Sequence, residues 1–99
     1  MARVELAPEV FEDFDRFLAH LARFEVADAP VRIGEIVQAI QILTHSPLIG
    51  RPVKGGKREL IIGQDAHGYI ALYRFVPSID TVFVLAIRSQ RESGYKRKH

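Results

Sequence analysis

Apolar residues recur at helical spacing in the first part of the chain. Pro8 opens this segment, and proline suits the first turn of a helix, where its missing N–H group is not needed. The apolar positions that follow lie on one stripe: Val10, Phe11, Phe14, Phe17, Leu18 and Leu21. The spacing predicts an amphipathic helix from Pro8 whose phenylalanines are buried in the core.

A second, narrower apolar stripe follows and predicts a second helix. Asp28 and Pro30 mark its start, and Ser46-Pro47 its end, because the residue before a proline avoids the helical region. Its apolar positions are Ile33, Ile36, Val37, Ile40 and Leu43. Two amphipathic helices joined by a short link predict a helical hairpin.

The second half of the chain changes to strand-like runs. A short candidate strand precedes the helices at Arg3–Leu6, and three longer runs follow at Lys57–Gly63, Tyr69–Val76 and Thr81–Arg88. Gln64–Gly68 and Pro77–Asp80 separate them as turns, which predicts an antiparallel meander. Residues 47–56 hold two of the five prolines and three of the seven glycines, and this segment is predicted to be a loop.

The predicted fold is α+β, in the order β-α-α-β-β-β, as a single domain spanning residues 1–99. A helical hairpin packs on one face of a small four-stranded, mainly antiparallel sheet. Along the central strand, side chains alternate between the faces: Tyr69, Ala71, Tyr73 and Phe75 share one face, and Ile70, Leu72, Arg74 and Val76 the other. One face should pack on the helices. We expect the other to be open and available for docking.

Charge is distributed unevenly between the two halves of the chain. Residues 1–49 hold four Lys/Arg and eight Asp/Glu, whereas residues 50–99 hold ten and four. The asymmetry points to an anionic partner for the second half, either nucleic acid or an acidic protein segment; the alternative is a charge distribution that serves solubility only. The arginines at or near the strands are Arg58, Arg74, Arg88 and Arg91.

Each of these arginines also has a purely structural interpretation. Arg74 could pair with a carboxylate of a neighbouring element, and Arg88 and Arg91 could form a solvated rim. Glu59 is expected to be a strand-surface residue, and Glu12 and Arg16 an ordinary helix pair. The basic tail SGYKRKH is expected to fray.

Several classes of chemistry are not expected. The chain has no cysteine, so it forms no disulfide and no thiolate metal site. Its four histidines have no metal-type spacing with another ligand, and no cofactor is predicted. The N-terminus lacks a secretory signal, and no apolar run approaches the roughly 20 residues of a membrane span. We therefore expect a cytoplasmic protein with no membrane contact.

Three sequence segments resemble a known group of proteins: KRELIIG, GYIALYRFV and VFVLAIRSQRESGY. They are similar to the RelE/ParE superfamily of toxins from bacterial type II toxin–antitoxin systems, and most similar to its ParE-like, plasmid-stabilisation branch. The resemblance implies a toxin neutralised by a cognate antitoxin. RelE-like members are ribosome-dependent mRNA endonucleases, whereas ParE-like members inhibit DNA gyrase.

The resemblance also assigns provisional roles to residues. RelE-like nucleases typically carry Arg where this chain has Ile70, and relatives on this branch often have His where it has Ser89. An aliphatic side chain cannot neutralise phosphate, so we predict a DNA gyrase inhibitor. The residues predicted to bind antitoxin or target are Arg58, Arg74, Arg88 and Arg91. Under the alternative, an endonuclease acting on ribosome-bound mRNA, the phosphate site would be lined by Arg58, Arg88, Arg91 and Tyr95.

Overall fold

The computed structural model describes residues 1–24, 29–63 and 68–97. Its helices and strands follow the chain in this order: β1 (Arg3–Leu6), α1 (Pro8–Arg23), α2 (Ala29–Ile40), the 3-10 helix η1 (Gln41–Thr44), β2 (Arg51–Val53), β3 (Lys57–Ile62), β4 (Tyr69–Val76), the 3-10 helix η3 (Pro77–Ile79) and β5 (Thr81–Ser89). The predicted helix start at Asp28 and most of the predicted turn at Gln64–Gly68 lie outside the described residues.

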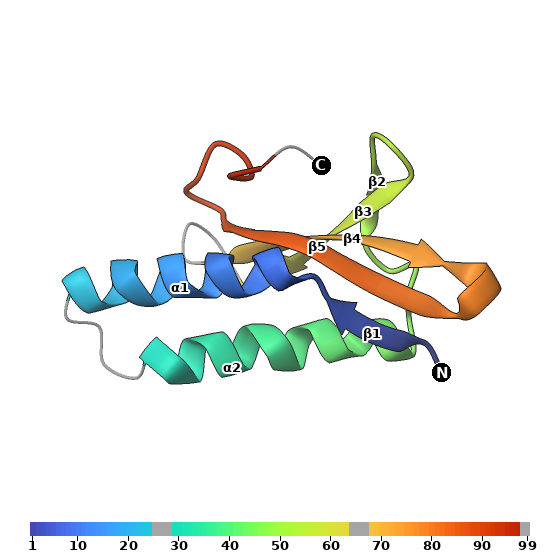
Figure 1. The fold of residues 1–99 in the computed structure, drawn as a ribbon, viewed down its shortest axis with the longest axis horizontal. Coiled ribbons are helices and arrows are strands. Elements are labelled where there is room, and N and C mark those ends of the chain that lie inside the picture. The colour runs from blue at the N-terminus through green and yellow to red at the C-terminus, as the bar shows by residue number, and fades with distance from the viewer. Residues whose placement is uncertain (25–28, 64–67, 98–99) are drawn as a thin grey trace.

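The strands form one mixed sheet in the order β1-β5-β4-β3-β2. β1 runs parallel to β5, and the other neighbours are antiparallel. Figure 1 shows α1 and α2 together on one side of this sheet. The predicted α+β arrangement is therefore confirmed, with one correction: the sheet has five strands rather than four.

The additional strand is β2, inside the segment that was predicted to be a loop. Arg51–Val53 pairs with β3 at the edge of the sheet. An edge strand tolerates Pro52, because the side of the strand that faces solvent needs no N–H donor. The proline and glycine content therefore marks a short edge hairpin.

Helix α1 packs through a narrower stripe than the sequence predicted. Val10, Phe14, Phe17 and Leu21 are buried, but Phe11 is 55% exposed. The Phe11 ring meets the Phe14 ring edge-on, with centroids 6.1 Å apart. The expectation that every phenylalanine of this helix is buried was thus wrong for Phe11, which lies at the border of the stripe.

Helix α2 ends at Ile40 and continues as the tighter 3-10 turn η1, before the end predicted at Ser46-Pro47. Its buried residues Ile36 and Ile40 and the η1 residue Leu43 join Phe14 in the core cluster. This confirms the helical hairpin's contribution to the core.

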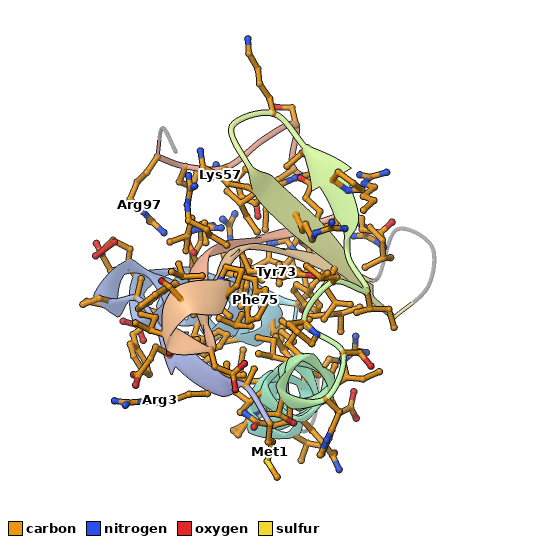
Figure 2. All side chains as sticks on the ribbon, turned by 90° about the vertical axis from the view of Figure 1, so that its right-hand side faces the viewer. Met1, Arg3, Lys57, Tyr73, Phe75 and Arg97 are labelled. Atoms are coloured by element: carbon orange, nitrogen blue, oxygen red, sulfur yellow. The ribbon has the colours of Figure 1, made fainter. Side chains whose placement is uncertain are left out.

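The core lies between the helices and one face of the sheet. β4 contributes Tyr69, Ala71, Tyr73 and Phe75 to it, the four residues that the alternation grouped on one face. Tyr73 is fully buried, and its hydroxyl accepts a hydrogen bond from the Gly50 N–H at 2.8 Å. A Cβ at position 50 would lie 2.6 Å from that hydroxyl oxygen, so only glycine fits. Figure 2 shows Tyr73 and Phe75 in the middle of the molecule.

The other face of the sheet, here called the far face, is covered over its middle. Ile70 is 5% and Leu72 4% exposed, although both point away from the helices. The C-terminal segment, residues 90–97, follows β5 and lies on this side of the sheet (Figure 1). Its hydrogen bonds, described below, show that the predictions of an open face and of a frayed tail were wrong as far as Arg97.

Candidate functional site on the far face

The far face carries most of the arginines and lysines of the sheet. Strand register places Arg51 opposite Glu59, Glu59 opposite Leu72, and Leu72 opposite Ala86. The cations on this face of the sheet, identified by alternation along their strands, are Arg51, Lys57, Arg74 and Arg88.

A β-bulge decides which residues of β5 belong to the far face. Leu72 pairs with Ala86, but Tyr73 pairs with Val84, so Leu85 is an additional residue on β5. A bulge of this kind shifts the alternation of the strand by one position. Val84 and Ile87 can therefore both join the core, while Arg88 points to the far face.

Glu59 is the carboxylate at the centre of this face. Its Oε2 accepts a 2.6 Å hydrogen bond from the Tyr95 hydroxyl, and its Oε1 accepts one of 2.8 Å from Arg51 Nη2. Burial by itself would raise the pKa of Glu59, but these hydrogen bonds and the charges of Arg51 and Arg88 outweigh it, so the pKa is lowered. Glu59 is only 9% exposed, so the prediction of a strand-surface residue was wrong.

Arg88 and Tyr95 lie together above Glu59. The Arg88 guanidinium lies 5.5 Å from the centre of the Tyr95 ring, and Arg88 Nη1 donates to the Glu92 carbonyl at 2.7 Å. Burial, followed by the hydrogen bond to Glu59 and the negative charge of Glu59, raises the pKa of Tyr95 above its ordinary value. In this arrangement the Tyr95 hydroxyl is the donor and the Glu59 carboxylate is the acceptor.

Asp13 of α1 anchors the C-terminal segment from the other side. It is 1% exposed and accepts hydrogen bonds from the Ile87 N–H at 2.9 Å, Arg97 Nη2 at 2.8 Å and Arg16 Nη1 at 2.8 Å. β1 pairs with β5 only as far as Val84. Asp13 thus accepts a hydrogen bond from the backbone of β5 at Ile87, beyond the end of the pairing with β1.

The sequence analysis missed Asp13 among the other acidic residues of α1. A signal was present, because Asp13 stands three residues after Val10 and one before Phe14, on the buried stripe. Arg16 pairs with Asp13 and, at 3.1 Å, with Glu92. The prediction that Arg16 serves an ordinary pair with Glu12 was therefore wrong.

Glu92 completes the attachment of the C-terminal segment. Its Oε1 accepts a hydrogen bond from the Ser89 N–H at 2.9 Å, in addition to its contacts with Arg16. Burial would raise the pKa of Glu92, but the Ser89 hydrogen bond and the Arg16 contacts lower it overall. The ionised form of Glu92 is thus favoured. Its contacts with Ser89 and Arg16 hold the chain where it turns back over the sheet.

The predicted site residues are divided between the two faces. Arg88 and Tyr95 are in contact, whereas Arg58 alternates to the helix side, opposite Tyr73, and donates to the carbonyls of Leu48 and Gly50 at 3.1 and 2.8 Å. The structure therefore does not bring Arg58 together with the other residues of the predicted phosphate site.

The two other predicted arginines are exposed. Arg74 Nη2 donates to the Gly55 carbonyl at 3.0 Å, so its hydrogen bond goes to the backbone rather than to the carboxylate considered as an alternative. Arg91 lies at a cavity of about 240 Å³ at the end of the sheet beside α1. The cavity is lined by Arg16, Phe17, His20, Tyr69, Ser89, Arg91 and Glu92.

Over residues 1–24, 29–63 and 68–97, no group of three His, Cys, Asp or Glu side chains could hold a metal ion. None of the helices in these segments is long and apolar enough to cross a membrane.

Known proteins match the chain over nearly its full length. A family model described as "ParE toxin of type II toxin-antitoxin system, parDE" matches residues 4–94. Toxin RelE3 of Caulobacter vibrioides is 34% identical over 97 residues, which cover 93% of this chain and 98% of the relative.

A solved structure agrees in fold. The structure titled "Chromosomal ParDE TA system from P. aeruginosa" superimposes with a TM-score of 0.71, covering 90% of this chain and 96% of that chain at 19% identity. This similarity concerns the fold alone.

Proposed function

We propose that this chain, which belongs to the ParE toxin family of type II toxin–antitoxin systems, acts by binding and inhibiting DNA gyrase. Membership of the family implies a cognate antitoxin. In this proposal the toxin is a cytoplasmic protein that binds its target and cleaves no RNA, in a module that contributes to plasmid stabilisation.

The observation that carries this proposal is the division of the basic residues between the two faces of the sheet. An enzyme that cleaves a phosphodiester needs cations converging on one phosphate and a group that moves a proton. Arg58 is held on the helix side by backbone carbonyls, away from Arg88 and Tyr95. Tyr95, the candidate proton-transfer group, is bonded to Glu59 and has a raised pKa.

Ile70 supports the same conclusion. It pairs with Arg88 in the register of β4 and β5 and is 5% exposed. An aliphatic, buried side chain at this position offers no charge to a scissile phosphate. Losing one such contact typically slows a reaction by about 10²–10³-fold.

The second candidate is a ribosome-dependent mRNA endonuclease. It is favoured by the contact between Arg88 and the Tyr95 ring beside a carboxylate, and by the name of the similar protein, Toxin RelE3. In this mechanism Arg88 and Arg91 would hold phosphate once Tyr95 had left Glu59.

Induction of the toxin in the absence of its antitoxin separates the two candidates. Gyrase inhibition should give altered plasmid supercoiling and DNA damage signalling while translation continues at first. The purified toxin should also inhibit supercoiling by gyrase directly.

The nuclease would instead stop translation at once and leave mRNA cut within codons. Cleavage that disappears on Arg91→Ala or Tyr95→Phe would replace the gyrase proposal by the second candidate. Glu12→Gln, an exposed change on α1, is a matched control for both assays.

The antitoxin is expected to carry an acidic, amphipathic segment that docks on this basic domain. Co-expression with the neighbouring small open reading frame, followed by pull-down of the toxin, is the direct test. Failure of that product to copurify would contradict the assignment of the partner.

A further inference from the structure

The first strand of the sheet has one edge without a strand neighbour. Within the described part of the chain, β1 ends the sheet order and pairs with β5 alone. The Arg3 N–H donates to the Asp80 carbonyl at 2.9 Å. The Ala7 N–H donates to the Val84 carbonyl, also at 2.9 Å. Because backbone groups alternate in direction along a strand, the N–H and C=O groups of Val4 point away from β5, to the open edge.

The open edge is short. At its start the Ala2 N–H already donates to the Thr44 carbonyl of η1 at 2.7 Å. After Leu6 the strand ends, and the chain enters α1 at Pro8. The part of the edge that can accept another strand is therefore centred on Val4.

The side chains of β1 form an apolar row and a charged row. Val4 and Leu6 pack against the core, so Arg3 and Glu5 lie on the far face. Arg3 Nε donates to Glu5 Oε1 at 2.6 Å, and the two side chains are 76% and 43% exposed. Figure 2 shows Arg3 extending outward from the molecule. The edge thus presents one cation and one anion, placed symmetrically on either side of Val4.

We propose that β1 pairs antiparallel with β1 of a second copy of this chain, about a twofold axis at Val4. The two Val4 residues then exchange N–H···O=C hydrogen bonds. In this register Arg3 of each copy lies opposite Glu5 of the other copy. Opposite charges that face each other across two strands stabilise the pair, so the edge is self-complementary, as a twofold interface requires.

The charges also select the register of this pairing. Moving the second strand by two residues in one direction places Glu5 opposite Glu5, and moving it in the other direction places Arg3 opposite Arg3. Like charges directly opposite each other destabilise a strand pair. Only the register centred on Val4 therefore satisfies both charges of each copy.

The same pattern favours a second copy over the acidic segment expected of an antitoxin. A run of carboxylates would be attracted by Arg3 but repelled by Glu5, so the edge has no net preference for it. A strand with one anion and one cation in the reverse order satisfies both positions. β1 of a second copy, running antiparallel, is such a strand.

A hollow beside β1 enlarges the surface that the pairing covers. The far-face side chains of a second β1 lie next to it, because paired strands share the faces of one sheet. Its volume is about 740 Å³, and it is lined by Arg3, Glu5, Leu6, Ala7, Pro8, Ile79, Thr81 and Phe83. With so short a strand pair, we expect a weak, transient dimer.

Sedimentation velocity of the full-length toxin tests the pairing, over protein concentrations from about 1 μM to about 1 mM. The wild type should shift from monomer to dimer within this range. Arg3→Glu and Glu5→Arg each place like charges in both cross-strand pairs, so each variant should self-associate about tenfold or more weakly. An equal mixture of the two variants restores both opposite-charge pairs and should form a heterodimer as tightly as the wild type pairs with itself.

A matched pair of variants controls for net charge. Arg23→Glu and Glu12→Arg make the same changes of net charge at exposed positions of α1. Each should self-associate like the wild type, and mixing them should give no gain. If the control pair behaves like the β1 pair, the effect comes from net charge and the proposal is overturned.

A second pair of variants tests the backbone contact. Val4→Pro removes the N–H at the open edge and leaves the hydrogen bonds between β1 and β5 in place, as proline does on an edge strand. It should be monomeric, whereas Val4→Ala, which keeps the N–H, should still dimerise. Circular dichroism checks that both variants are folded. Equal self-association of the two folded variants would contradict the strand pairing.

Two further outcomes would overturn the proposal. One is a wild-type toxin that stays monomeric up to about 1 mM. The other is a monomeric wild type that copurifies with its antitoxin while Val4→Pro does not, because the edge would then belong to the antitoxin. Self-association is measured without gyrase, so its result is independent of the gyrase proposal.

Discussion

The two faces of the middle of strand β4 are buried to a similar extent by different means. On the helix side, Ala71 and Tyr73 are fully buried among apolar residues of α1, α2 and the sheet. On the far face, Ile70 and Leu72 are 5% and 4% exposed, beneath a segment that hydrogen bonds and ion pairs attach to the sheet and α1. One face is covered by hydrophobic packing. The other is covered by residues 90–97 together with their hydrogen bonds and ion pairs, here called the polar clasp.

This difference matters because the two kinds of contact respond differently to change. Apolar burial is non-directional and depends on the area removed from water. The clasp depends on individual carboxylates, Asp13, Glu59 and Glu92, each of which joins elements distant in sequence. One of its donors, Arg97 Nε, is buried and finds no hydrogen-bond partner within the described part of the chain. We therefore expect the clasp to open before the core unfolds.

The largest effect is expected from removing an aromatic ring on the helix side. Phe14→Ala should lower the free energy of unfolding by about 4 kcal/mol, because Phe14 is 6% exposed and its loss leaves a cavity. Urea denaturation measures this change. Phe11→Ala serves as its partner variant, since that ring is 55% exposed and should cost far less. Similar losses in both variants would contradict the packing described for α1.

Next in size is the loss of the central carboxylate of the clasp. Asp13→Asn should cost about 3 kcal/mol, as expected when one member of a buried ion pair is removed. The effect should lie at the low end of such values because the Arg16 and Arg97 side chains are 28% and 27% exposed. The variant should also show faster tryptic cleavage after Arg91. The exposed Asp15→Asn is the control, and equal cleavage rates in the two variants would remove the anchoring role of Asp13.

A smaller effect is expected from the hydroxyl that closes the far face. Tyr95→Phe removes the 2.6 Å hydrogen bond to Glu59 but keeps the ring under Arg88. Hydrogen bonds to charged groups contribute about 1.5–3 kcal/mol, and Glu59 retains Arg51, so a loss of about 1.5 kcal/mol is expected in urea denaturation. Tyr95→Phe could lower the free energy of unfolding without changing the rate of tryptic cleavage after Arg91. That result would show that the clasp and the core unfold as one unit.

The smallest effect is a dependence of stability on acid pH. The pKa values of Glu59 and Glu92 are lowered in the folded protein from the ordinary value of 4.5. Their stabilising contribution is therefore complete above pH 4.5 and is lost as the pH falls through the lower, folded pKa values. Urea midpoints measured from about pH 6 to about pH 3 should fall less steeply in Glu59→Gln than in wild type. If the urea midpoint of Glu59→Gln depends on pH as steeply as that of the wild type, the protonation of Glu59 does not contribute to the pH dependence of stability.

The sequence predicted the helix side of the molecule well because local periodicity carries the necessary information. The stripes of both helices identified Phe14, Ile36 and Ile40 as core residues, whereas the alternation of β4 placed Tyr73 on one face without deciding which face packs on the helices. Gly50 was different: it was noted only as part of a loop, and its need to be glycine arises from the Tyr73 hydroxyl 23 positions away.

The far face was predicted poorly because its contacts connect residues that are distant in the chain. Glu59 meets Tyr95 36 positions later, and Asp13 meets Arg97 84 positions later. A basic tail and an acidic helix residue each resemble solvated surface when considered locally. Only the sheet register and the bulge at Leu85 show which side chains share a face.

The sequence by itself determined the order of the two helices and of four of the five strands, the hairpin of helices, the alternation of side chains along β4 and the resemblance to a family. These properties depend on periodicity and on short motifs, which are local. Tertiary structure decided that Arg58 lies on the side opposite Arg88, that Tyr95 is bonded to Glu59 and that the far face is covered. The physical reason is that an ionic contact depends on the position of both partners in space, whereas an apolar stripe needs only a surface to cover.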